Sequence, residues 1–249
     1  METHAHHLHK APGKNLWHFF FEFLMLFLAV FCGFLAENLR EHQVEKSREK
    51  QFMQSLVGDL KSDIASITVL NQIRESRHEM YDSLSSSIIQ KKYIENGAAF
   101  YFWGRSISRR VHFFSSDGTI QQLKNSGGLR LISNKSIADK IVAYDVLYSR
   151  ILHQQELEET QLCVYRVLAG KIFDAAVFHK MTIRKDTIVF EKPEGNPQLK
   201  DNSPASLNEI ANTLNYWVVG STMNYQFLEE LKIEAVSLIE LIQKEYHLE

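Results

Sequence analysis

Residues 16–36 read LWHFFFEFLMLFLAVFCGFLA and are apolar throughout, apart from His18 and Glu22. A helix of this length is about 30 Å long at about 1.5 Å per residue, which matches the hydrocarbon core of a bilayer. No later stretch of the chain is comparably apolar. The sequence therefore predicts one transmembrane helix over residues 15–37, with the lipid bilayer around it and the rest of the chain hung from one side.

The flanking charges give opposite predictions for the orientation of this span, depending on which charges are counted. The apolar core is too long for a cleavable signal peptide, so we expect an uncleaved signal anchor. Counting lysine and arginine alone favours a cytoplasmic C-terminus, whereas the net charge of the flanks, which includes Glu37, Glu41, Glu45 and Glu49, favours a cytoplasmic N-terminus. Because long domains cross the membrane largely regardless of their charge, we expect a cytoplasmic N-terminus and an external C-terminal domain.

One face of the predicted span carries a carboxylate and three small residues. Glu22, Ala29, Gly33 and Ala36 fall at i, i+7, i+11 and i+14 of a helix. Ala29 and Gly33 have the small-xxx-small spacing that lets two helix backbones approach closely. This face is a candidate docking surface for a partner's transmembrane helix or for a second copy of the chain. The alternative is that Glu22 reaches the lipid headgroups and the small residues have no role.

The tail before the span, residues 1–14, is rich in histidine. Short tracts of this kind bind Zn²⁺, Ni²⁺ or Cu²⁺ through neutral imidazoles. The candidate ligands are His4, His6, His7 and His9. Because no cysteine accompanies them, a flexible polar tail with adventitious metal affinity is the favoured interpretation, and we predict no cofactor.

After the span, residues 38–51 alternate in charge sign and predict a solvated helical stalk. From Phe52 onward, apolar residues recur at helical spacing as far as Ile88, which predicts a one-sided helix that needs partner helices. Asp59 and Asp63 lie one turn apart on this helix, and we expect both to be surface charges. Asn96-Gly97 is expected to end it.

The following segment, AAFYFWGRSISRRVHFF (residues 98–114), is dense in aromatic residues and arginines. A candidate basic and aromatic patch comprises Trp103, Arg105, Arg109 and Arg110. Such a patch could bind an anion or a carbohydrate, or lie at the headgroup level of a membrane. A core helix with a basic outer edge is the favoured alternative, since aromatic clusters usually fill cores.

The remaining sequence predicts further helices around one extended segment. Thr119 and Gln122 form a capping-box pattern before a short helix, and Asn134 precedes a long helix over residues 135–178. Residues 181–190 alternate apolar and polar residues and predict a small β-hairpin or a single extended strand. Ser206 with Glu209 opens a last helix to about Tyr246. We predict a mainly α fold: an antiparallel helical bundle over residues 52–249, with up to four helices.

Composition and motifs exclude several classes of function. The formal net charge of −2 offers no basic face for nucleic acid, and the two cysteines cannot pair if Cys32 lies in lipid. No nucleophile elbow, paired-histidine zinc motif or phosphate-binding glycine loop is present. The sequence therefore names no catalytic residues.

The order of these parts resembles a family of single-pass membrane proteins of unknown function in Bacteroidota-type bacteria. The matching features are the early acidic residue Glu22, the stalk EKQFMQSLVGDLKSDI and the segment TIQQLKNSGGLRLISNKSIADKIVAYDVLY at residues 119–148. The resemblance implies the bacterial inner membrane with a periplasmic domain. It supplies no activity. The docking face of the span and the long stalk favour a membrane-anchored interaction or scaffold protein of an envelope complex. The alternative is a sensor-like ligand-binding bundle that signals through a partner.

Overall fold

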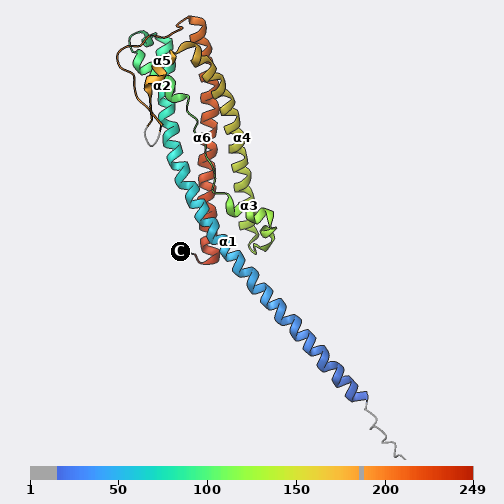
Figure 1. Ribbon diagram of the computed structural model, residues 1–249. Coiled ribbons are helices and arrows are strands. Elements are labelled where there is room, and N and C mark those ends of the chain that lie inside the picture. The colour runs from blue at the N-terminus through green and yellow to red at the C-terminus, as the bar shows by residue number, and fades with distance from the viewer. Residues whose placement is uncertain (1–15, 185–187, 249) are drawn as a thin grey trace, which may run out of the picture. The chain divides into compact units, whose positions relative to one another are not determined.

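The computed structural model describes residues 16–184 and 188–248, with the backbone alone at Arg184. The chain is mainly helical, as predicted (Figure 1). Its helices are α1 (Leu16–Ile89), α2 (Gly97–Ile107), α3 (Gly118–Asn125), α4 (Lys135–Ile172), α5 (Ala175–Met181) and α6 (Pro204–Tyr246). Short 3-10 turns, η1 (Lys92–Ile94) and η2 (Gly128–Leu131), and strands β1 (Thr182–Arg184) and β2 (Ile188–Phe190) complete it.

The chain divides into two compact units, Met1–Gln51 and Phe52–Glu249. In the first unit, residues 16–36 are helical and long and apolar enough to cross a membrane. Almost every apolar side chain there is exposed, including Leu16 at 88% and Val30 at 74%. An uninterrupted apolar surface of this size is not stable in water, and lipid or another apolar helix must cover it.

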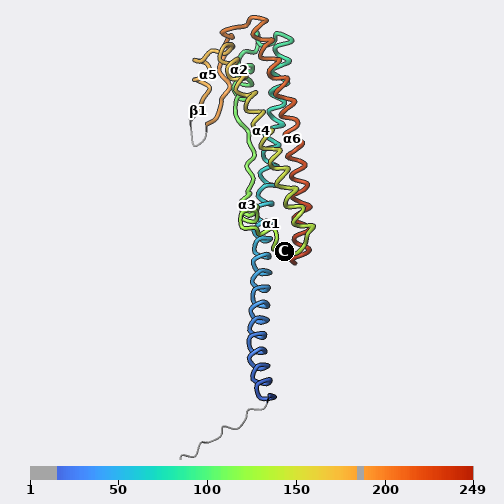
Figure 2. The backbone as a smooth tube through the Cα atoms, turned by 90° about the vertical axis from the view of Figure 1, so that its right-hand side faces the viewer, coloured from blue at the N-terminus to red at the C-terminus, as the bar shows by residue number. Residues whose placement is uncertain are grey.

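The second unit is built on three long helices. α1 from Phe52 onward and α4 run in the same direction, and α6 runs opposite to both (Figures 1 and 2). Side-chain pairs show this register, since Asp63 bonds Tyr144 and Arg74 bonds Glu158 in rising order along α1 and α4. The chain returns from the end of α1 to the start of α4 through α2, an extended connection and α3. Between α1 and α4, the described residues thus form only short helices, and the three long helices make up the body of the bundle.

Two hydrophobic cores lie one above the other in this bundle. The first core surrounds the part of α1 that follows Phe52 and packs against α3, α4 and the end of α6. The second core surrounds the end of α1 and packs against α2, α4, α5 and the start of α6. The largest fully buried members of the second core are tyrosines and phenylalanines from α2 and α4: Phe100, Tyr101 and Tyr165.

Several helix ends differ from the sequence prediction. α1 ends at Ile89, because Lys91 adopts a left-handed conformation (φ 56°), and Gly97 begins α2 rather than ending α1. Gly97 and Gly104 are sites of close approach, where a Cβ atom would lie 2.1 Å from the Pro197 carbonyl oxygen and 2.3 Å from the Phe173 ring respectively.

The caps also differ. Asn134 caps α4 as predicted, accepting from the Ser136 amide at 3.0 Å. α3 is preceded by Asp117 rather than capped by Thr119, and α6 is capped by Ser203 rather than Ser206. Both helices begin earlier than the predicted capping boxes, and Pro204 occupies the first turn of α6.

The long helix predicted over residues 135–178 is broken in two. α4 ends at Ile172, where Phe173 becomes extended and its ring stacks on Phe178 at 4.9 Å. Asp174 then caps α5 by accepting from the Ala176 amide at 2.7 Å. The predicted hairpin is confirmed, with β1 and β2 antiparallel and Ile183 opposite Val189.

Candidate functional site

A layer of polar side chains separates the two hydrophobic cores. It occupies positions on α1, α4 and α6 that continue the helical spacing of the buried apolar residues. We call these residues the polar layer: Asn71, Arg74, Arg77, His78, Gln154, Gln155, Glu158, Ser221 and Asn224. Buried charged and amide groups are costly unless paired, so this layer is the least expected part of the core.

The centre of the polar layer is an ion pair between Arg74 and Glu158. Their side chains are 3% and 8% exposed, and the Arg74 Nη1 atom lies 3.2 Å from Glu158 Oε1. Arg74 also donates to the Ser221 hydroxyl at 3.3 Å and to the Val111 carbonyl at 3.1 Å. The guanidinium thus links α1 to α4, to α6 and to the connection that precedes α3.

Burial lowers the pKa of two neighbouring groups in this layer. Burial first, and then the charge of Arg74, lowers the pKa of Arg77 to about 10. The His78 pKa is also lowered, mainly by burial and then by Arg74. His78 shares a hydrogen bond of 3.1 Å with the Ser221 hydroxyl. Positive charge is therefore concentrated here against a single buried carboxylate.

Some buried atoms of the layer lack hydrogen-bond partners among the described residues. Asn224 is fully buried, and neither atom of its amide group is paired; the Nε atoms of Arg74 and Arg77 are also unpaired. Such groups are rare in folded proteins because each costs roughly 1–3 kcal/mol. Unpaired polar groups at these positions make the polar layer a candidate functional site.

The connection from α2 to α3, residues 108–117, runs along the bundle (Figures 1 and 2). Side chains of the helices bind it. Gln155 holds Phe113 through both backbone groups, with distances of 2.5 Å to the amide and 3.2 Å to the carbonyl. Asp63 accepts from the Ser115 hydroxyl and from the Ser116 amide. We call this element the clamped segment.

The predicted surface position of Asp63 is wrong. Its side chain is buried, at 1% exposure. Tyr144 also donates to it at 2.6 Å, and these hydrogen bonds compensate for the burial of the carboxylate. Burial and the Asp63 carboxylate raise the pKa of Tyr144 well above its usual range. Asp59, by contrast, is half-buried and accepts from the Thr119 amide at 3.2 Å. Both carboxylates therefore anchor α3 and the clamped segment.

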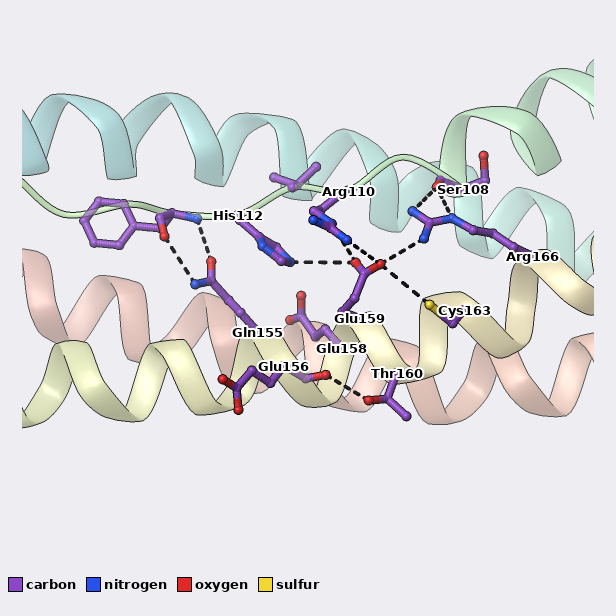
Figure 3. Close-up of polar contacts among 12 residues, drawn as sticks. Ser108, Arg110, His112, Gln155, Glu156, Glu158, Glu159, Thr160, Cys163 and Arg166 are labelled. Carbon is purple, nitrogen blue, oxygen red and sulfur yellow. Dashed lines mark hydrogen bonds and ion pairs between the residues drawn. The ribbon is translucent and has the colours of Figure 1, made fainter.

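Beside the polar layer, Glu159 gathers several groups at the start of the clamped segment (Figure 3). Arg110 makes a two-point contact with it at 2.8 and 2.9 Å, and Arg166 approaches at 2.9 Å. The hydrogen bond from Arg110 is the main reason that the pKa of Glu159 falls to about 2. His112 lies 3.9 Å from the same carboxylate, and burial lowers its pKa.

An open groove of about 660 Å³ lies between α1, α2, the clamped segment and β2. Its apolar lining includes Ile73, Met80 and Phe190, and its basic lining includes Arg77 and Arg109. The Arg109 guanidinium lies over the Phe190 ring, 5.4 Å from its centroid. We refer to it as the basic groove. Its size is typical of sites for small ligands.

The structure divides the predicted basic and aromatic patch. The guanidinium groups of Arg105 and Arg109 both lie over the Phe190 ring, with Arg105 4.4 Å from its centroid. Arg110 turns to Glu159 but still lines the basic groove. Trp103 packs against the second core and does not line the groove.

The other predicted site residues lie in the first unit or outside the described residues. Glu22, Ala29, Gly33 and Ala36 are all exposed, and a Cβ atom at Gly33 would meet nothing within 4 Å. The candidate metal ligands His4, His6, His7 and His9 lie outside the described residues. Among residues 16–184 and 188–248, no group of three or more His, Cys, Asp or Glu side chains is placed to hold a metal ion.

The polar layer itself was missed by the sequence reasoning. Its signal was present on α1, where Arg74 and Arg77 take core positions between Ile67 and Leu84. Buried polar residues likewise interrupt the apolar stripe of α4 at Glu158 and that of α6 at Ser221 and Asn224. Charged residues usually mark the solvated face of a helix, so such a pattern does not by itself indicate a buried layer.

Comparisons of this chain with protein-family models, with curated protein sequences and with solved structures find no match.

Proposed function

We propose that this protein is a single-pass, membrane-anchored interaction protein, a subunit or accessory of an envelope complex. The observation that carries the proposal is the exposed apolar start of α1, because lipid is a covering that suits an apolar helix of this length. The proposal includes the bacterial inner membrane, a cytoplasmic N-terminus and a periplasmic bundle. It is supported by the resemblance of the chain to a family of single-pass membrane proteins of unknown function.

The docking face of the span is the proposed contact with a partner. Glu22, Ala29, Gly33 and Ala36 share one side of α1, and no described residue covers them. A carboxylate in lipid is costly unless it faces protein or water, which favours a partner helix on this side. The partner is either another membrane protein or a second copy of the chain.

Native co-purification from membranes tests the scaffold proposal. The complex is extracted in mild detergent and sized for the wild type and for Glu22→Ala and Gly33→Leu variants. We expect both variants to lose components or to shrink, whereas Phe31→Leu, on the opposite face of the same helix, leaves the complex intact. A complex of unchanged size and composition in all variants refutes docking through this face.

The orientation has its own test. Alkaline phosphatase fused at the C-terminus is expected to be active, because it folds only outside the cytoplasm, and a green fluorescent protein fused at the N-terminus is expected to fluoresce. The reverse pattern refutes the proposed topology.

The basic groove favours a second candidate, a sensor-like bundle that binds a small ligand. Arg77 and Met80 line the groove from α1, the helix that also contains the apolar segment. A ligand in the groove would therefore contact this helix directly. A ligand screen by thermal shift on the full chain tests this candidate, and a bundle whose melting temperature no ligand raises contradicts it.

A further inference from the structure

The basic groove holds guanidinium groups that no described carboxylate neutralises. Its lining contains Arg77, Arg109 and Arg110, of which only Arg110 is ion-paired within the described part of the chain. The nearby carboxylates are already engaged, Glu158 by Arg74 and Glu159 by Arg110 and Arg166. The groove is therefore electrostatically complementary to an anion.

Arg77 is a buried component of this site rather than a surface charge. It is 8% exposed, and its Nη2 atom donates to the Ile107 carbonyl at 2.5 Å. Its guanidinium also lies over the Trp217 ring, 4.9 Å from the centroid, while its Nε atom has no described hydrogen-bond partner. These contacts fix the orientation of a cation at the groove wall without cancelling its charge.

The remainder of the lining is mainly apolar. Side chains of α1, α2 and β2 contribute this surface, and several are unusually exposed for their type, including Ile73 at 43% and Val189 at 43%. Apolar surface of this kind gains free energy when it is covered, at about 25 cal/mol per Å². A small inorganic anion would leave it exposed, so the ligand needs an apolar part as well as a charge.

We propose that the basic groove binds a single-chain amphiphile with an anionic head, such as a long-chain carboxylate or an alkyl phosphate. The head contacts Arg77 and Arg109, and the chain covers Ile73, Val189 and Phe190. Guanidinium groups bind carboxylates and phosphates through paired N–H donors, so both head types fit the same site. The volume of about 660 Å³ suits one alkyl chain and its head. This inference rests on the second candidate function, ligand binding by the bundle.

The test measures binding of radiolabelled laurate to the full chain in phosphatidylcholine nanodiscs, with empty nanodiscs subtracted. We expect saturable binding that unlabelled dodecyl phosphate displaces. Dodecyltrimethylammonium, which has the same chain and a cationic head, and acetate, which has the head without the chain, should not displace it at equal concentration.

Two pairs of variants locate the site. Arg109→Gln removes a groove charge, and its control is Arg150→Gln, because Arg150 likewise lies over a phenylalanine, 4.3 Å from the Phe227 centroid, but outside the groove. Ile73→Gln makes the groove wall polar, and its control is Val69→Gln, an exposed α1 residue outside the lining. Both groove variants should weaken binding about tenfold or more, and both controls should leave it unchanged.

The proposal is overturned if laurate does not bind saturably, or if the cationic amphiphile displaces it as well as dodecyl phosphate does. It is also overturned if the groove variants and their controls lose laurate binding equally. Unaltered melting temperatures of the four variants, measured alongside, separate a lost site from a lost fold. The scaffold proposal fails independently, since it depends on the co-purified complex and on the span variants. A complex that survives Arg109→Gln while laurate binding is lost confirms the groove without affecting the scaffold.

Discussion

Replacing Glu158 by alanine is expected to destabilise the bundle strongly. The substitution leaves the Arg74 guanidinium, which is 2% exposed, without a counter-charge inside the protein. Its other contacts, the Ser221 hydroxyl and the Val111 carbonyl, are neutral and cannot replace a carboxylate. Removing one partner of a buried ion pair typically costs about 3–5 kcal/mol. For a domain of this size, that cost lowers the melting temperature by about 6–20 °C.

Replacing both partners should cost much less. In Arg74→Met with Glu158→Leu, both charges are gone and the side chains fill similar volumes, a change that is often neutral or stabilising. The remaining cost comes from the Val111 carbonyl, which loses a donor, and amounts to roughly 1–2 kcal/mol. The double variant should therefore be more stable than the single Glu158→Ala variant.

Thermal unfolding of the full chain, followed by circular dichroism at 222 nm, measures these differences. Glu156→Ala is the control, because Glu156 lies two residues away on α4 with its side chain 79% exposed. We expect the control to melt within about 0.5 kcal/mol of the wild type. A single Glu158→Ala variant as stable as the control, or a double variant less stable than the single one, refutes the assignment of Arg74 and Glu158 as a coupled buried pair.

Three further predictions concern pH, close packing and backbone strain. Because the folded-state pKa values of His112 and Glu159 are both lowered, each contributes stability that is present above its unfolded pKa and is lost as pH falls through its folded pKa. Stability should first decline below about pH 6.5 and then again between 4.5 and about 2. Urea titrations should show that His112→Gln reduces the first decline, to which His78 also contributes, and that Glu159→Gln reduces the second by about 1 kcal/mol at this partly solvated site. Gly104→Ala should lower the free energy of unfolding by about 1–3 kcal/mol, since its Cβ atom would lie 2.3 Å from an aromatic ring. Gly170→Ala should raise it by about 0.5–1 kcal/mol, because a Cβ atom there would meet nothing within 4 Å. Equal melting temperatures for the two variants contradict the packing at Gly104. Lys91→Gly should raise the melting temperature slightly, because Lys91 has φ 56°, and a lower melting temperature contradicts the left-handed conformation.

The helices were predictable from sequence because each has a long apolar stripe of helical period. This applies to α1 from Phe52, to α4 and to α6, and the alternation at residues 181–190 likewise predicted the hairpin. The break at Phe173 was not predictable, because residues 172–178 have no glycine or proline. It follows from the packing of the Phe173 ring, which is a tertiary interaction.

The burial of Asp63 and Arg74 was hidden for a different reason. Their partners Tyr144 and Glu158 lie 81 and 84 residues further along the chain. The burial of a charged residue can be inferred only when the position of its partner along the neighbouring helix is known. The sequence identified two arginines of the basic groove, Arg109 and Arg110, but not the buried Arg77, because its contacts with Ile107 and Trp217 are distant in the chain.

The clamped segment has a consequence for which mutations the protein tolerates. The helices hold it largely through its backbone: Arg166 donates to the Ser108 carbonyl, Arg74 to the Val111 carbonyl, and Gln155 contacts both backbone groups of Phe113. A backbone group is the same whatever side chain accompanies it. During divergence, identity at the half-buried Val111 is therefore expected to drift, while Arg74, which binds its carbonyl, stays fixed. Ser108 should vary less, because its buried hydroxyl also donates to the Arg105 carbonyl at 2.6 Å. Deep mutational scanning should find Val111 permissive and Arg74 intolerant.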